Sequence, residues 1–133
     1  MGIFEGAQPL KYSGLIAGAG CTAATAQYRF VKFSADNTVI PCAATTDIPC
    51  GILQAPAPAV GDPVEVTYGG ESLLQAGAGM TAGVPVGTTA TGQGQTAVAT
   101  QYPVALPVNV AGATTAGTLI TVVVNCANPI VKA

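Results

Sequence analysis

Hydrophobic and polar residues alternate at every second position in several short segments, which is the pattern of half-buried β-strands. Residues 27–33 carry aromatic and β-branched side chains on both faces of such a strand. Residues 34–37 contain turn-forming residues, and residues 38–40 return as an apolar strand. The pattern therefore predicts a β-hairpin over residues 27–40.

The clearest alternation lies over residues 63–68, where apolar side chains face inward and Glu65 and Thr67 face outward. The glycine pair 69–70 follows directly, and two glycines between apolar runs are typical of a two-residue hairpin turn. Residues 71–76 then form the returning strand. This segment predicts a second hairpin.

Further short strands are expected over residues 51–54, 84–86 and 95–100. In residues 104–110, valine and leucine alternate with prolines of the opposite parity, which favours an edge strand because proline cannot donate a ladder hydrogen bond. Residues 118–124 are almost continuously apolar, which predicts the strongest strand, at the centre of the sheet.

Good helix formers are scarce, and no segment shows the spacing of an amphipathic helix. Many short strands separated by turn signals predict an all-β fold, a small single-domain β-barrel or sandwich. Residues 1–20 have no clear period and are interpreted as an extended N-terminal arm, followed by a β-rich domain over residues 21–133.

Charge is rare in this chain of 133 residues: it has 4 Lys and Arg, 6 Asp and Glu, and no His, for a net charge of −2. Nucleic-acid binding is not expected, because four basic residues cannot neutralise many phosphates. Between Glu71 and Lys132 there is no charged residue at all. A surface with so little charge is expected to meet other protein surfaces.

Membrane insertion is not expected either, because no apolar run reaches the length of about 18 residues that a spanning helix needs. The first residues lack the basic region of a secretory signal, so none is expected.

The four cysteines are Cys21, Cys42, Cys50 and Cys126. They permit two disulfides in three pairings, but without a secretory signal we expect small, buried, reduced thiols. No two are spaced as a metal site requires, and a cysteine nucleophile would need a histidine.

Two weak patterns suggest other chemistry. Residues 18–23 match the letters of a dinucleotide fingerprint, but a strand-like run rather than a helix follows, so no nucleotide site is expected. Glu65 and Glu71 could face each other across the predicted hairpin as the carboxylate pair of a glycosidase, although solvent-facing strand residues explain them better. We predict no catalytic, metal-binding or cofactor-binding residue and no enzymatic activity.

Five segments, taken in order, resemble the small capsid decoration, or cement, proteins of tailed bacteriophages. They are RFVKFSADNTV (29–39), IPCGILQ (48–54), VGDPVEV (60–66), AGAGMTAGVPV (76–86) and AGTLITV (116–122). The first 20 residues, the four cysteines and the proline-rich stretch 101–110 depart from the family pattern.

The resemblance implies a structural virion protein that binds the major capsid protein on the outer capsid surface, often as a homotrimer, and bridges neighbouring capsid subunits. Within the arm, Phe4, Pro9, Leu10 and Tyr12 are then the expected capsid contacts, because aromatic and apolar anchors dominate interfaces. The alternative is another virion or cell-surface structural module, such as a fibre or adhesin domain.

Overall fold

Ten β-strands make up most of the regular structure in the computed structural model, which describes residues 9–110 and 115–133. The strands are β1 (Leu10–Lys11), β2 (Ile16–Ala17), β3 (Phe30–Ala35), β4 (Thr38–Pro41), β5 (Gly51–Leu53), β6 (Val66–Gln75), β7 (Val86–Thr88), β8 (Gly94–Thr96), β9 (Ala105–Asn109) and β10 (Leu119–Asn125). A short 3-10 helix, η2 (Ala24–Ala26), precedes β3.

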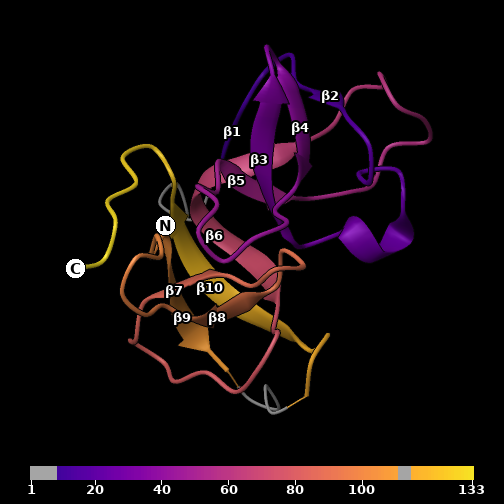
Figure 1. Ribbon diagram of the computed structural model, residues 1–133. Coiled ribbons are helices and arrows are strands. Elements are labelled where there is room, and N and C mark those ends of the chain that lie inside the picture. Colours follow the sequence, from indigo (N-terminus) through magenta and orange to yellow (C-terminus); the bar gives the residue numbers. More distant parts are fainter. Residues whose placement is uncertain (1–8, 111–114) are drawn as a thin grey trace, which may run out of the picture.

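All ten strands belong to one sheet, in the order β2-β4-β3-β5-β6-β10-β9-β7-β8, with β1 paired to β6. Figure 1 shows β3, β4 and β5 in one half of the molecule and β7, β8 and β9 in the other, with β6 extending from one half into the other. The all-β prediction is confirmed. The sheet is strongly bent but not closed, so it corresponds only loosely to the predicted barrel or sandwich.

The middle of the sheet is buried on both faces, because consecutive residues of β3 and β5 belong to different hydrophobic cores. Phe30 and Ile52 belong to one core, and their neighbours Val31 and Leu53 belong to the other. The large core comprises Phe30, Cys42, Ile52, Leu74, Ala76, Met80, Val86, Val104, Ala105, Ile120, Val122, Val124 and Cys126. The small core comprises Leu15, Ala17, Cys21, Ala26, Val31, Val39, Cys50, Leu53, Ala57 and Val66.

The first predicted hairpin is confirmed as β3 and β4, which pair antiparallel from Val31↔Pro41 to Ala35↔Thr38. Asn37 lies in the turn with φ 54°, a left-handed conformation that asparagine tolerates better than most residues. The strand starts at Phe30 rather than at residue 27, because Tyr28 adopts φ 61° and interrupts the extended backbone.

The second predicted hairpin is wrong, because residues 66–75 form the single strand β6. Gly70 has φ 86°, which bends the strand instead of reversing it. The two halves of β6 have different partners: Val66 and Thr67 pair with β5, whereas residues 69–75 pair with β10. Thr67, predicted to face outward, is buried.

β10 confirms the prediction of a central strand, since it lies between β6 and β9. β9 was predicted as an edge strand, but in the sheet order it lies between β10 and β7. It pairs with β7 through Ala105↔Val86, at one end. The side chain of Pro107 is buried and that of Leu106 is exposed.

The other short strands are confirmed with shifted bounds. The segment predicted over residues 51–54 is β5, and those predicted at 84–86 and 95–100 are β7 (Val86–Thr88) and β8 (Gly94–Thr96). β7 and β8 pair with each other over Val86↔Thr96 to Thr88↔Gly94.

The described part of the predicted arm lies within the sheet. β1 pairs with β6 through Leu10↔Gly69 and Lys11↔Thr67. β2 pairs parallel to β4, and Leu15 and Ala17 are buried in the small core. From Leu10 onward these residues are therefore part of the folded body.

Candidate interaction surfaces

Of the four predicted capsid contacts, Phe4 lies outside the described residues, and the other three take different positions. Pro9 and Leu10 are exposed, with Leu10 lying against Gly69. Tyr12 is instead half-buried and held within the molecule. The structure therefore leaves Pro9 and Leu10 accessible to a partner and uses Tyr12 as an internal anchor.

Tyr12 is fixed by one hydrogen bond and two aromatic contacts. Its hydroxyl donates to the backbone oxygen of Cys50 at 2.9 Å. Its ring packs edge-on against Phe33, with centroids 5.7 Å apart, and lies 4.7 Å from the ring of Tyr68. Burial, followed by the nearby Cys50 thiol, raises the pKa of Tyr12 to about 12, so its hydroxyl remains a donor at neutral pH.

An open groove of about 550 Å³ lies beside Tyr12. Its apolar walls come from Phe33, Ile48, Pro49 and Pro129, with the buried thiols of Cys50 and Cys126. On its polar side, Lys32 Nζ lies 2.9 Å from Asp47 Oδ2.

Asp47 Oδ2 also accepts hydrogen bonds from the backbone N–H groups of Ala43 at 2.7 Å and Ala44 at 2.9 Å. Burial alone would raise the pKa of Asp47, but the hydrogen bonds from Lys32 and these amides outweigh it and lower the pKa. The carboxylate therefore anchors the 43–47 turn.

One face of the β6–β10–β9 portion of the sheet is left uncovered in the described structure. Val123 lies opposite Leu106 across one strand pair, and Thr121 lies opposite Leu73 across the other, so these side chains share a face. We call the residues Leu73, Leu106, Leu119, Thr121 and Val123 the outer face. Its leucines and valine are 37 % to 44 % exposed, although they lie on central strands.

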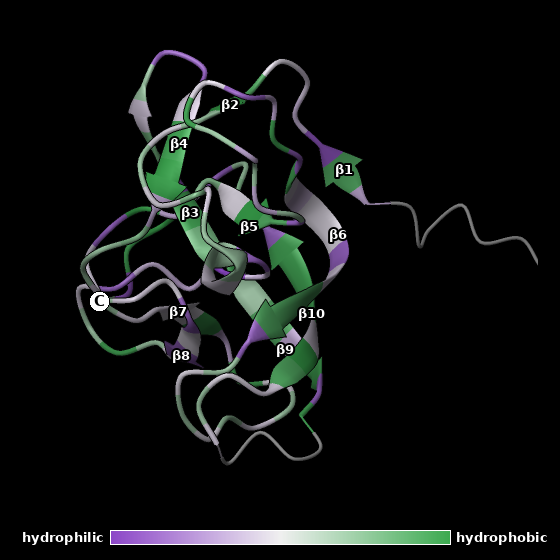
Figure 2. Ribbon diagram, turned by 90° about the vertical axis from the view of Figure 1, so that its right-hand side faces the viewer, coloured by the Kyte–Doolittle hydropathy of each residue, from purple (hydrophilic) through white to green (hydrophobic). Residues whose placement is uncertain are grey.

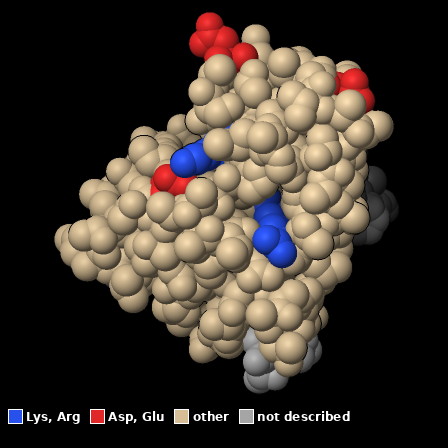
Figure 3. Space-filling model, turned by 45° about the vertical axis from the view of Figure 1, so that its right-hand side comes forward, with Lys and Arg blue, Asp and Glu red and all other residues tan. Residues whose placement is uncertain are grey.

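The outer face is nearly free of charge. Glu71, opposite Val123, is the charged residue that shares this face in the described strands. Figure 2 colours much of β9 and β10 as apolar, and Figure 3 shows few charged groups on the side it presents. β9 contains a β-bulge at Val108, and the exposed side chain of Val108 lies beside the outer face. These residues were not expected as contacts, because the nearly continuous apolar run 118–124 predicted a central strand without showing which of its side chains face outward.

A second groove, of about 460 Å³, borders the outer face and shares Leu106 and Val123 with it. We call it the C-terminal groove. Its remaining walls are Pro85, Pro103, Val104, Ala105, Asn125, Asn128, Ile130, Val131 and Lys132.

Glu65 and Glu71 do not form a carboxylate pair across a hairpin, because that hairpin does not exist. Glu65 directly precedes β6 and Glu71 lies within it, so the two residues follow each other along one strand. Because each residue of a strand advances the chain by about 3.3 Å, they are separated along the strand and do not lie opposite each other. Glu65 instead forms an ion pair with Lys11, at 3.0 Å. The structure therefore does not assemble the glycosidase-like arrangement.

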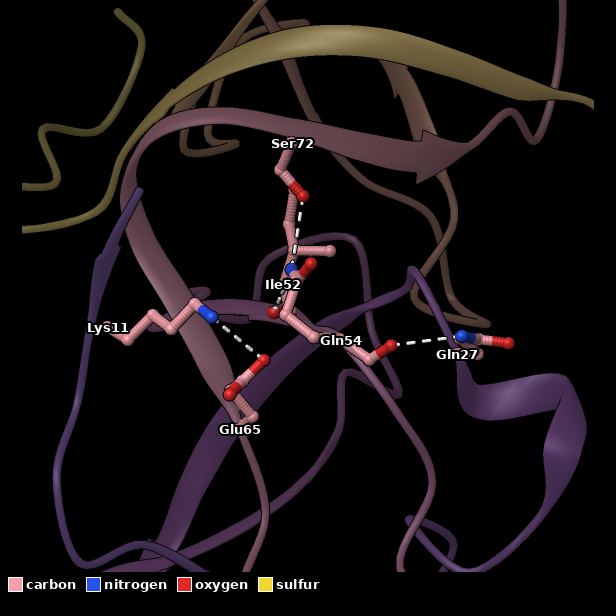
Figure 4. A network of polar contacts seen from close by, with 6 residues as sticks. All are labelled: Lys11, Gln27, Ile52, Gln54, Glu65 and Ser72. Carbon is pink, nitrogen blue, oxygen red and sulfur yellow. Dashed lines mark hydrogen bonds and ion pairs between the residues drawn. The ribbon is translucent and has the colours of Figure 1, made fainter. Parts of the chain in front are cut away.

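The polar contacts near β5 connect strands to one another (Figure 4). Gln54 Nε2 donates to Ser72 Oγ at 3.1 Å and to the backbone oxygen of Ile52 at 3.0 Å. Gln27 Nε2 donates to the backbone oxygen of Gln54 at 3.0 Å. Apart from the local bond to Ile52, these contacts join Gln54 to β6 and to the segment before β3, which is the arrangement of a structural network.

All four cysteines are free and buried. Burial raises the pKa of Cys42 and of Cys50 to about 12, and also raises the pKa of Cys21 and Cys126. A thiol that stays protonated is a poor nucleophile and a poor metal ligand. Residues 9–110 and 115–133 contain no cluster of three or more His, Cys, Asp or Glu placed to hold a metal ion.

The glycine-rich segment 18–23 packs tightly for a structural reason. A side chain at Gly18 would meet Ile40 and the backbone oxygen of Val39, and the Gly18 N–H donates to that oxygen at 2.8 Å. The segment leads into the three-residue helix η2, not into the longer helix that a dinucleotide site requires. Within the described residues, no helix has the length and apolar character to cross a membrane.

A scan against protein-family models finds no match, and a search of curated proteins finds none either.

Proposed function

We propose that this chain is a non-catalytic structural protein that decorates the outer surface of a tailed-bacteriophage capsid and strengthens the contacts between its major capsid proteins. The observation that carries the proposal is the outer face, a largely aliphatic surface on the central strands of the sheet, beside which Glu71 is the charged strand residue. Monomeric proteins rarely leave such a surface uncovered, and it suits a protein partner better than a nucleic acid or a small polar substrate.

The ordered sequence segments provide the second support. Residues 29–39 and 116–122, which resemble the capsid decoration proteins, contain the β3–β4 turn and most of β10. They are framework elements, so the resemblance concerns the body of the domain and not only its loops.

In this proposal the outer face packs against the major capsid protein, with Pro9 and Leu10 as additional contacts. Burying aliphatic side chains contributes about 25 cal/mol per Å² of apolar area, and attachment through several copies multiplies the effect. Homotrimer formation and a location on the virion surface belong to the same proposal.

The test is a binding assay with expanded capsids that lack their decoration protein. We expect the wild-type chain to bind at micromolar concentration or below. The double variant Leu106→Asp/Val123→Asp should lose at least about tenfold in affinity, because it buries two carboxylates in an apolar interface. The matched control is Val60→Asp, which alters an exposed apolar residue that is not part of the outer face. Light scattering of the free protein then measures whether it is a trimer.

Absence of capsid binding by the wild-type chain would overturn the proposal. Binding to a glycan or to host cells instead would favour a fibre or adhesin module. Equal affinity of the double variant and the wild type would show that capsid contact uses another surface.

A further inference from the structure

β1 lies beside the C-terminal groove. Leu10 pairs with Gly69, and its Cδ1 is 3.0 Å from the position that a β-carbon on Gly69 would take. Gly69 pairs in turn with Asn125 of β10, which lines the groove. Two strand spacings of about 4.8 Å each therefore bring Leu10 within about 10 Å of a wall of the groove.

The direction of β1 points the preceding chain towards the same groove. Because β1 is antiparallel to β6, the chain that precedes Leu10 continues in the direction in which β6 runs from Gly69 to Glu71. Val123 lies opposite Glu71 and is another wall of the groove. Six extended residues span about 20 Å, so a side chain at position 4 can reach Val123 from Leu10.

The groove combines an aliphatic wall with one cation. Four of its apolar side chains are 42 % to 67 % exposed, namely Leu106, Val123, Ile130 and Val131. The charged residue of its wall is Lys132, whose ammonium donates to the backbone oxygen of Ala97 at 3.0 Å. The ion pairs among the described residues belong to Lys11 and Lys32, so Lys132 has no carboxylate partner there. Such a groove suits an apolar side chain accompanied by an acidic one.

Residues 1–8 carry this combination. Ile3 and Phe4 are followed directly by Glu5, the acidic residue of the segment. Along β6, Glu5 would approach the like charge of Glu71, whereas in the C-terminal groove it would approach Lys132. Charge therefore favours the groove over the rest of the outer face.

The groove beside Tyr12 is less suitable for the same segment. Its cation, Lys32, is already paired with Asp47 at 2.9 Å. An incoming carboxylate would meet the charge of Asp47 there as well as that of Lys32.

We propose that residues 1–8 dock in the C-terminal groove of their own chain, with Phe4 against Val123 and Ile130 and with Glu5 near Lys132. Docking would cover the two residues that the groove shares with the outer face, so a partner that binds there has to displace the segment. The docking itself is a property of the free chain and does not depend on capsid binding.

NMR of the full chain without a partner tests the docking. We expect nuclear Overhauser effects between the Phe4 ring and the methyl groups of Val123 and Ile130. Phe4→Ala should lower the ratio of docked to undocked chains by about tenfold or more, because burial of the ring favours the docked state. Binding of a hydrophobic dye should rise accordingly. The matched control is Val60→Ala, which shortens an exposed apolar side chain that does not line the groove and should leave dye binding unchanged.

The charge contact has its own test. Glu5→Gln should lower the docked ratio by about two- to fivefold at low salt, and high salt should remove the difference from the wild type. An equal docked ratio in Glu5→Gln and the wild type at low salt would overturn the pairing of Glu5 with Lys132.

Three results would overturn the docking. Absence of contacts from Phe4 to Val123 and Ile130 in the wild-type chain would show that the segment does not occupy the groove. Contacts from Phe4 to Leu73 and Thr121 instead would place it elsewhere on the outer face. Contacts that disappear on dilution would show that the segment occupies the groove of a second copy.

Discussion

Val123 of β10 and Leu106 of β9 lie directly opposite each other, and both side chains point out of the domain. They are 43 % and 42 % exposed, whereas the adjacent Val122 and Val124 are buried in the large core. A run of three consecutive valines is therefore divided between core and surface by the period of the strand.

The division within β10 predicts unequal effects of the same substitution. Val122→Ala should lower the free energy of unfolding by about 1.5–3 kcal/mol, because it leaves a cavity in the large core. Val123→Ala should lower it by less than about 1 kcal/mol, since its side chain is already in contact with solvent. Urea unfolding of the two variants measures both values. A larger loss for Val123→Ala would contradict the orientation of β10.

Gly70 should be required for the bend in β6. Gly70→Ala introduces a β-carbon at φ 86° and should lower the free energy of unfolding by about 1–2 kcal/mol. Gly70→Asn should lose less, because asparagine tolerates the left-handed region. Thermal unfolding of both variants measures the difference. Equal midpoints for Gly70→Ala and the wild type would argue against this backbone conformation.

Tyr12 should stabilise the fold and not only contact a partner. Tyr12→Phe removes the hydrogen bond to the backbone oxygen of Cys50 and should cost about 1 kcal/mol in the free energy of unfolding. Tyr12→Ala also removes the ring contacts with Phe33 and Tyr68 and should cost more. Unfolding in urea without any partner measures this. Wild-type stability of Tyr12→Ala would show that residues near Tyr12 are a detachable arm.

Asp47 should make stability depend on acid. Because its pKa is lowered in the folded protein, its contribution is present above its ordinary value of 3.8 and is lost as the pH falls through the folded value. Asp47→Asn should therefore be less stable than the wild type at neutral pH, and this difference should shrink as the carboxylate is protonated. Urea midpoints across the acid range measure it. A constant difference at every pH would contradict a role for the carboxylate charge.

The buried thiols and Tyr12 should make stability fall in alkali. The pKa values of Cys42 and Cys50 are raised from 9.0 to about 12, and that of Tyr12 from 10.0 to about 12. Their stabilising effect is complete below the ordinary pKa values and is lost as the pH rises towards about 12, which urea midpoints across the alkaline range would measure.

Burial of the cysteines also predicts slow chemical labelling. A thiol reagent at neutral pH should label the native protein slowly, and it should label all 4 cysteines after unfolding. Rapid labelling of the native protein would contradict their burial.

Local pattern was sufficient for much of the fold. The β3–β4 hairpin depends on neighbouring residues, namely an alternating strand, a turn with Asn37 and an apolar return strand, so the sequence predicted it. The nearly continuous apolar run of β10 likewise indicated a central strand. The near absence of charge after Glu71 predicts a surface suited to protein contact, but it does not show which side chains would form that surface.

What the sequence by itself determined is thus the all-β class, the main strands and the low charge, because each of these is set by residue type and short-range period. Tertiary structure alone decided the course of β6, since a glycine pair is equally suited to a turn or a bend. Here β5 and β10 pair with its two halves and impose the bend. Long-range pairing also decided that Tyr12 is an anchor and that Val123 and Leu106 face outward, because the orientation of a strand depends on which face its partners leave uncovered.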